Sequence, residues 1–170
     1  MRAEDFASFQ LSDDDEELLS KNFSLLLRDC RLHSLRPADF SSAVSATSGC
    51  YLWLMRLGGS SYKIYVGRTH SIRRRLTDYS GHFQPHSPND FKLRFFEEFI
   101  REVFPAAELD LYFIAHPLEK CGDTEKQLIR VLRPLINSLP PSTAEERELL
   151  RAAFSQFYRS ALLRRLRSDH

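Results

Sequence analysis

The sequence lacks the features that mark several common classes of protein. It has only three cysteines, Cys30, Cys50 and Cys121, and their wide spacing matches neither a disulfide framework nor a zinc site. It has no basic and apolar leader at its start and no apolar run of membrane-spanning length. With a formal net charge of +1, overall charge gives no sign of a polyanionic partner. We therefore expect a soluble protein of a reducing compartment, the cytoplasm, away from membranes.

What is present suits a compact domain. The chain has 170 residues, of which 42% are hydrophobic and 13 are phenylalanines, enough for one sizeable core. Charge is unevenly spread, because residues 1–48 carry an acidic surplus and residues 49–170 a basic one. A phosphate backbone would be attracted to that basic part.

The stretch from Gly49 to Tyr79 predicts a β-hairpin followed by a helix. Two runs rich in aromatic and branched residues, Tyr51–Met55 and Tyr62–Val66, favour strands. Gly58 and Gly59 between them are typical of a tight turn. We expect Gly67 to end the second strand and Ser71 to cap a helix that runs to Tyr79.

On that helix Ile72, Leu76 and Tyr79 share one face, with Arg75 one turn before Tyr79. The hairpin tyrosines, Tyr51 and Tyr65, should therefore converge with Arg75 and Tyr79 where the hairpin meets the helix.

Two sequence blocks carry a resemblance to a known family. Gly49-Cys50-Tyr51 and Tyr65-Val66-Gly67 stand in the order of the two tripeptides of the GIY-YIG endonucleases, and the helix after them resembles that of the excision-repair branch. Downstream, the run from Glu125 to Asn137, with Arg133-Pro134 before the asparagine, is similar to the family's closing block. The resemblance covers roughly residues 49–137.

The resemblance implies a set of catalytic residues at the matching positions. They are Tyr51, Tyr65, Arg68, Arg75, Tyr79, Glu125 and Asn137. Glu125 is implied as the ligand of one Mg²⁺ or Mn²⁺ ion, and DNA as the partner. Further DNA contacts are expected from residues of the helix, the following loop and the C-terminus. These are Arg73, Arg74, His82, Arg164 and Arg165.

The same residue types suit phosphodiester hydrolysis on chemical grounds. The reaction needs an activated water and stabilisation of charge on the transition state. A guanidinium such as that of Arg75 can bridge two phosphate oxygens, and the carboxylate of Glu125 is a hard ligand for a hydrated Mg²⁺. A tyrosine needs a neighbouring cation to act as a base. Which of Tyr51 and Tyr65 takes the proton stays open, with a metal-bound hydroxide, His70 or His82 as alternatives.

Each residue also has a purely structural interpretation. Hairpin tyrosines usually pack, and taken alone Glu125 would be an acidic residue of a first helical turn. This chain also departs from the family pattern at two positions: Cys50 stands in place of isoleucine and Arg68 in place of lysine. A buried cysteine behaves as a small hydrophobe, whereas arginine keeps the charge of lysine but cannot shuttle a proton.

The flanking segments predict further helices and one more strand. We expect residues 1–12 to form an arm, Asp13–Cys30 an amphipathic helix and residues 31–48 a connector. After the central block, Asp90–Phe104 predicts a helix and Leu109–Ile114 the third strand.

The next helix should open at Gly122-Asp123-Thr124, with Glu125 in its first turn, and end near Asn137. Pro140-Pro141 marks the end of the compact unit, and a capping-box pattern predicts a last helix to about Leu166.

These expectations combine into an α+β fold with a three-stranded antiparallel sheet flanked by helices, and with extra helices at both ends. Residues 1–48 form an N-terminal arm and helix packing on the core, 49–137 the catalytic domain, and 138–170 a helical extension. The expected function is a divalent-metal-dependent DNA endonuclease, targeted by its own loops and terminal helices, a homodimer or a partner protein. The alternatives are a catalytically silent nucleic-acid-binding module on the same fold and a protein-interaction scaffold.

Overall fold

The structure, a computed structural model, describes residues 3–31, 36, 46–80, 96–97, 100–102 and 104–139, and beyond them residues 145, 148–149 and 152. The chain divides into two units, Met1–Leu139 and Pro140–His170. The first unit has an α+β fold. In the second unit the four described residues are helical. The rest of the predicted C-terminal helix, with Arg164 and Arg165, lies outside the described residues.

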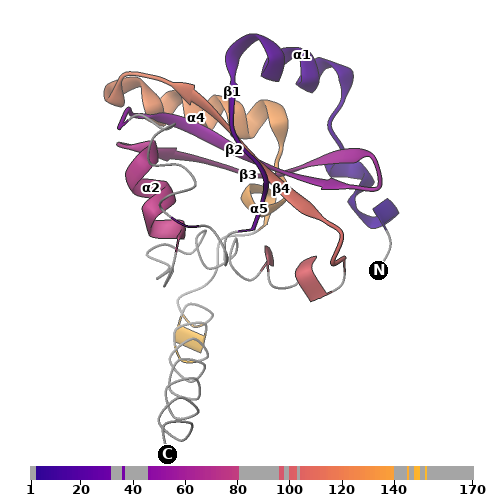
Figure 1. The fold of residues 1–170 in the computed structure, drawn as a ribbon. Coiled ribbons are helices and arrows are strands. Elements are labelled where there is room, and N and C mark those ends of the chain that lie inside the picture. The colour runs from indigo at the N-terminus through magenta and orange to yellow at the C-terminus, as the bar shows by residue number, and fades with distance from the viewer. Residues whose placement is uncertain are drawn as a thin grey trace, which may run out of the picture. The chain divides into compact units, whose positions relative to one another are not determined.

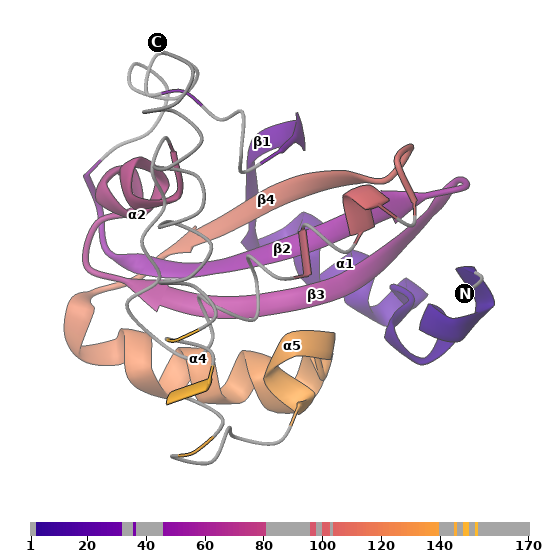
Figure 2. The same cartoon turned by 90° about the horizontal axis from the view of Figure 1, so that it is seen from below.

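The first unit is built on a four-stranded antiparallel sheet. Its strands are β1 (Ser24–Cys30), β2 (Gly49–Leu57), β3 (Ser60–Thr69) and β4 (Glu108–Ala115), in the order β1-β4-β2-β3. Figure 2 shows the strands side by side, with β1 and β3 at the two edges. The expectation of three strands was therefore wrong, because β1 adds a fourth.

Strand β1 lies where a continuous helix was predicted. The helix α1 covers only Asp13–Asn22, and at Phe23 the backbone turns extended, with φ −112° and ψ 148°. The leucines that follow then pair with β4 instead of continuing the helical stripe. Asp29 has a φ of 54°, and its N–H donates to the Asp110 carboxylate at 3.0 Å. Pairing with an otherwise open edge of β4 thus overrides the local helical periodicity.

The predicted hairpin is present and longer than expected. Gly58 and Gly59, with φ of 58° and 83°, form the two-residue turn, which matches the twist of the strands. Trp53 pairs with Tyr65 but Leu54 with Lys63, so β3 carries one extra residue as a bulge. The strand does not end at Gly67 but continues to Thr69.

Helices cover both faces of the sheet. The described helices are η1 (Ala3–Phe9, a 3-10 helix), α1 (Asp13–Asn22), α2 (Ile72–Tyr79), α4 (Leu118–Leu132) and α5 (Leu135–Ser138). Figure 1 shows α1 and α4 on one side of the sheet and α2 on the other. The side chains of β2 alternate accordingly: Tyr51 and Trp53 pack with the α2 core, and Cys50 and Leu52 with the α4 core.

The N-terminal residues are part of the core, which corrects their prediction as an arm. Phe6 is buried, and its ring lies edge-on at 6.0 Å from the rings of Tyr62 and Phe104. A buried ion pair also joins α1 to the sheet, because Lys63 Nζ donates to Asp15 Oδ2 at 2.5 Å. The first 30 residues therefore belong to the same folded unit as the hairpin.

Helix α4 starts earlier than predicted. It begins at Leu118 after Pro117, which places Gly122 and Glu125 in the helix interior rather than at its start. It ends at Leu132, where Arg133 takes a left-handed conformation with φ 49° and ψ 57° before Pro134. Of the helix predicted over 90–104, residues 96–97 and 100–102 are helical, and most of the others lie outside the described residues.

Among the helices described, none is long and apolar enough to cross a membrane.

Candidate active site

The three predicted tyrosines meet in one buried cluster. Tyr51 comes from β2, Tyr65 from β3 and Tyr79 from the end of α2. The ring of Tyr51 lies edge-on to both others, at 6.0 Å from Tyr65 and 6.4 Å from Tyr79. The hydroxyls of Tyr51 and Tyr79 share a hydrogen bond of 3.0 Å. The hairpin and the helix are thereby joined through polar groups inside an otherwise apolar core.

Gly67 provides the space for this cluster. A Cβ at position 67 would lie 2.6 Å from both Cζ and Oη of Tyr51 and 3.0 Å from Tyr65 Cε1. The Tyr51 hydroxyl therefore lies directly over the backbone of β3, where no residue with a side chain fits without moving a buried ring. In this chain, steric contact with Tyr51 thus explains why the last position of the Tyr65-Val66-Gly67 motif is a glycine.

Helix α2 brings arginines to the same place. Ser71 caps it, since its side chain accepts a hydrogen bond from the Arg74 N–H. Arg75 is half-buried and its Cζ lies 5.7 Å from the centroid of the Tyr79 ring, within cation–π range. Arg73 and Arg74 are exposed. The sequence thus predicts correctly which arginine turns toward the tyrosines.

Glu125 and Arg68 form a separate pair on the other face of the sheet. Arg68 Nε lies 3.2 Å from Glu125 Oε2, and the two side chains are 57% and 22% exposed. Burial raises the pKa of Glu125 above its usual value, although the charge of Arg68 and a hydrogen bond from the Arg68 N–H act in the opposite direction. The carboxylate is thus held in a partly desolvated place, where a cation is its natural partner.

An open cleft of about 530 Å³ is lined by Arg68 of the one group and by Arg75 beside the other. Its lining is mostly polar and comes from β3, α2 and α4: Arg68, Thr69, His70, Ser71, Arg74, Arg75, Asp78, Leu118 and Cys121. Arg68 reaches it from the Glu125 side and Arg75 from the tyrosine side. Three arginines against one aspartate give the cleft a positive charge. A phosphate in it would lie between the two predicted halves of the site.

The residues near Glu125 suit a hydrated divalent ion held by a single carboxylate. Within the described part of the chain, no group of three or more His, Cys, Asp and Glu side chains could hold a metal. An ion at Glu125 would then keep water or phosphate oxygens as its other ligands, a mode that Mg²⁺ commonly adopts. The chemistry of the donor set fits such an ion, provided that the guanidinium of Arg68 leaves the carboxylate.

Asn137 acts on the sheet and not in the cleft. Its Oδ1 accepts from the Val66 N–H at 2.8 Å, and its Nδ2 donates to the Val66 carbonyl at 2.9 Å. The amide therefore pairs with the outer edge of β3 beside Tyr65 and Gly67, as a further strand would. We assign it a positioning role.

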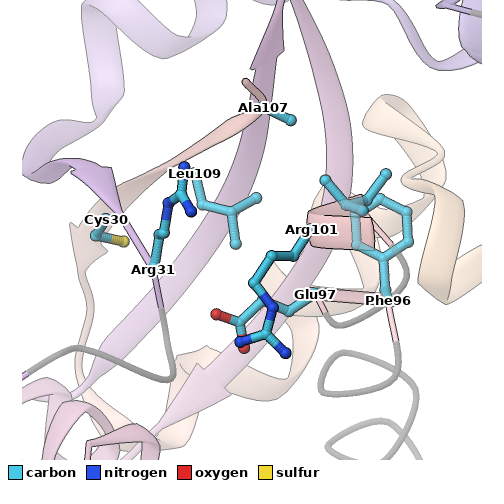
Figure 3. A pocket seen from close by; sticks show the side chains of 8 residues that line it. Cys30, Arg31, Phe96, Glu97, Arg101, Ala107 and Leu109 are labelled. Atoms are coloured by element: carbon cyan, nitrogen blue, oxygen red, sulfur yellow. The ribbon is translucent and has the colours of Figure 1, made fainter. Parts of the chain in front are cut away.

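A second cavity, shown in Figure 3, is too small for a substrate. It measures about 20 Å³, room for about one water molecule. Cys30, Leu109 and Phe96 line it together with Glu97. Burial raises the pKa of the Cys30 thiol to about 12, and the charges of Asp110 and Glu97 add to the effect, so the thiol is a poor nucleophile.

Some residues of the cleft were not predicted from the sequence, and some predicted residues lie outside the described ones. His82, like Arg164 and Arg165, falls outside them. Leu118 and Cys121 were missed, because α4 was expected to begin only at Gly122. Pro117 is the signal that marks the true start, since proline is common at the beginning of helices. Comparisons of the chain with models of protein families, with curated proteins and with solved structures find no match.

Proposed function

We propose that this chain is a divalent-metal-dependent DNA endonuclease of the GIY-YIG type. The observation that carries the proposal is the cleft between the two residue groups. Arg75, which contacts Tyr79, and Arg68, which pairs with Glu125, both line it. These are the residues at the positions of the two family motifs.

The arginines would bind the scissile phosphate. Arg68, Arg74 and Arg75 all line the cleft, and a guanidinium can donate two parallel hydrogen bonds to phosphate oxygens. Because Arg75 is half-buried beside Tyr79, its position is better defined than that of the exposed Arg74. We assign stabilisation of the transition-state charge to Arg75 and general attraction of the DNA backbone to Arg74.

Glu125 would hold the metal ion, which when bound supplies an activated water and neutralises charge on the phosphate. The tyrosines would orient and deprotonate the water once it enters their cluster, since Tyr51, Tyr65 and Tyr79 are only 1%, 6% and 0% exposed. Tyr51 and Tyr79 already share a hydrogen bond, so a phenolate on one hydroxyl would accept a hydrogen bond from the other. Tyr65 is the other candidate base, since its ring packs beside Tyr51 at the same place.

A plasmid-nicking assay tests the proposal. We expect supercoiled DNA to be relaxed by the wild-type chain in Mg²⁺ and not in EDTA. The variant Glu125→Gln keeps the shape of the side chain and removes its charge, so it should lose cleavage while retaining DNA binding. Intact plasmid under all metal conditions would contradict the proposal.

A nucleic-acid-binding module without catalysis is the second candidate. The observation that favours it is the Arg68–Glu125 ion pair, since the expected metal ligand already has a cationic partner. Salt-sensitive binding of DNA with no cleavage in any divalent metal would support this alternative.

A further inference from the structure

The Arg68–Glu125 pair has a feature that a simple surface ion pair lacks: the guanidinium lies against a glycine of the opposing helix. A Cβ at Gly122 would lie 2.6 Å from Arg68 Nη1 and 3.8 Å from its Cζ. Apart from the adjacent residues and the backbone of the helix itself, no other heavy atom of the described residues lies within 4 Å of that Cβ position. Gly122 is in the interior of α4, one turn before Glu125. The helix thus leaves a place for the Arg68 side chain that any other residue at 122 would fill.

Arg68 is also able to leave this place. Its side chain is 57% exposed, whereas that of Glu125 is only 22% exposed. The carboxylate is therefore the main contact that keeps the guanidinium in this place. Arg68 lines the basic cleft as well. A phosphate in the cleft would offer it two acceptor oxygens in a geometry that suits its fork. The same side chain therefore has two alternative anionic partners.

A metal ion and Arg68 compete for one carboxylate. Both are cations that offset the partial desolvation of Glu125, and a hydrated ion needs the carboxylate oxygen that lies 3.2 Å from Arg68 Nε. With Arg68 in place, metal binding has to break the ion pair first. With Arg68 on a phosphate, the carboxylate is open to the metal.

We propose that Arg68, lying on Gly122, blocks metal binding at Glu125 until a phosphate backbone binds the guanidinium instead. We call this block the lock. The inference rests on the proposed function, because it takes Glu125 as the metal ligand and a nucleic-acid phosphate as the ligand of the cleft. Metal and nucleic acid then bind with positive coupling: each raises the affinity for the other by the same factor. The chain holds metal weakly until its substrate is bound.

The coupling factor follows from the exposure of the pair. Exposed ion pairs change equilibria by up to about fivefold, and coupling between sites starts at a similar value. Because Glu125 is more buried than a typical surface carboxylate, we expect a factor of about five to ten.

The variant Gly122→Ala tests the lock without changing any charge. Its methyl group would displace the guanidinium of Arg68, whose far end is flexible, and alanine suits a helix interior better than glycine. The measurement is Mn²⁺ affinity in the absence of DNA, from the free Mn²⁺ signal in electron paramagnetic resonance. We expect Gly122→Ala to bind Mn²⁺ about five- to tenfold more tightly than the wild type, and Glu125→Gln to lose this binding.

A matched charge control separates the lock from general repulsion of cations. Arg68→Gln and Arg74→Gln remove the same charge from the same cleft, but only Arg68 contacts Glu125. The lock predicts that Arg68→Gln tightens Mn²⁺ binding as Gly122→Ala does, and that Arg74→Gln changes it less than about twofold. Equal tightening in the two arginine variants would overturn the proposal. So would a Gly122→Ala affinity equal to that of the wild type, including the case in which neither binds Mn²⁺.

The reverse direction is tested by DNA affinity. Fluorescence anisotropy with a short labelled duplex gives the ratio of affinities with and without Mn²⁺, in proteins that all carry Arg75→Ala so that the duplex is not cleaved. Glu125→Gln gives the background effect of the ion on DNA itself. Above that background we expect the ratio to be about five to ten times larger for the chain with Gly122 than for Gly122→Ala, in which only the direct contact of the ion with phosphate remains. Equal ratios in the two proteins would refute the coupling. Plasmid nicking by the wild type in Mg²⁺ would then still support the nuclease function on its own.

Discussion

The contact between Tyr51 and Gly67 makes the substitution Gly67→Ala a sharp test of how the site is held. The added carbon would lie 2.6 Å from Tyr51 Cζ and Oη. Carbon atoms prefer separations of about 3.5–4.0 Å, so the ring or the strand has to move by about 1 Å. Tyr51 is 1% exposed, so its neighbours in the core have to move with it.

The cost of this substitution can be worked out from the contacts. Overpacking of a filled core costs about 1–3 kcal/mol, and loss of the Tyr51–Tyr79 hydrogen bond adds about 1 kcal/mol. We expect the free energy of unfolding to fall by about 2–4 kcal/mol, which lowers Tm by about 5–15 °C for a chain of this size. Cleavage should fall as well, since the hydroxyl is displaced.

Gly122→Ala is the matched control for the stability measurement. It adds the same methyl group at a similar contact distance, but the neighbour is the mobile end of Arg68. In a helix interior this change gains about 0.5–1 kcal/mol, which loss of the Arg68–Glu125 ion pair offsets, so we expect little net change in stability. Urea unfolding followed by circular dichroism measures both variants. Equal effects of the two substitutions, or a Gly67→Ala protein as stable as the wild type, would refute the argument that Tyr51 is held over Gly67.

Four further predictions concern other parts of the structure. Arg75→Ala should lower the single-turnover cleavage rate by about 10²–10³, whereas Arg73→Ala, which removes an exposed charge, should mainly weaken DNA binding in a salt-dependent way; equal rate losses would contradict the role of Arg75. Asn137→Ala leaves the N–H and carbonyl of Val66 without the amide and should cost about 1–3 kcal/mol in urea unfolding; an unchanged midpoint would show that the amide does not support β3. Burial raises the pKa of Asp15, but hydrogen bonds from Lys63 and Ser12 outweigh it and keep the pKa below its usual 3.8. The stability from this pair is therefore present above that pH and lost as pH falls through the lowered pKa, so wild type and Lys63→Met should converge in unfolding free energy in acid; a constant difference would refute the linkage. Burial raises the pKa of Cys50 to about 12, and Cys50 is buried, so its thiol should react with a thiol reagent only after unfolding; rapid labelling of Cys50 in the native protein would contradict this.

The hairpin and the helix after it could be predicted because every local signal agrees there. Strand propensities, a two-glycine turn and a serine cap all specify the same elements. The face of α2 that carries Tyr79 follows from helical spacing alone, and the tyrosine cluster follows from it.

Strand β1 could not be predicted, because its leucines continue the spacing of α1. Only pairing with β4, about 80 to 90 residues away along the chain, decides that the segment is extended, and this contact leaves no local signal. The burial of Phe6 against Tyr62 could not be predicted for the same reason, because the two residues lie far apart in the sequence.

Glu125 was placed wrongly because two local signals compete. Gly122-Asp123-Thr124 looks like a helix start, but Pro117 provides an earlier one. The early start puts Gly122 under Arg68 and Glu125 beside it. An ion pair between an edge strand and a helix interior depends on packing and cannot be read from spacing.

Single-turnover cleavage of a labelled DNA duplex, with DNA affinity determined in parallel, tests whether this chain cuts DNA with a metal ion at Glu125. We predict Mg²⁺-dependent cleavage by the wild type. Glu125→Gln and Arg75→Ala should lose most of that cleavage while still binding the duplex, and the losses should persist at saturating protein. Duplex binding by the wild type without any Mg²⁺- or Mn²⁺-dependent cleavage would contradict the account, and so would cleavage at the wild-type rate by Glu125→Gln.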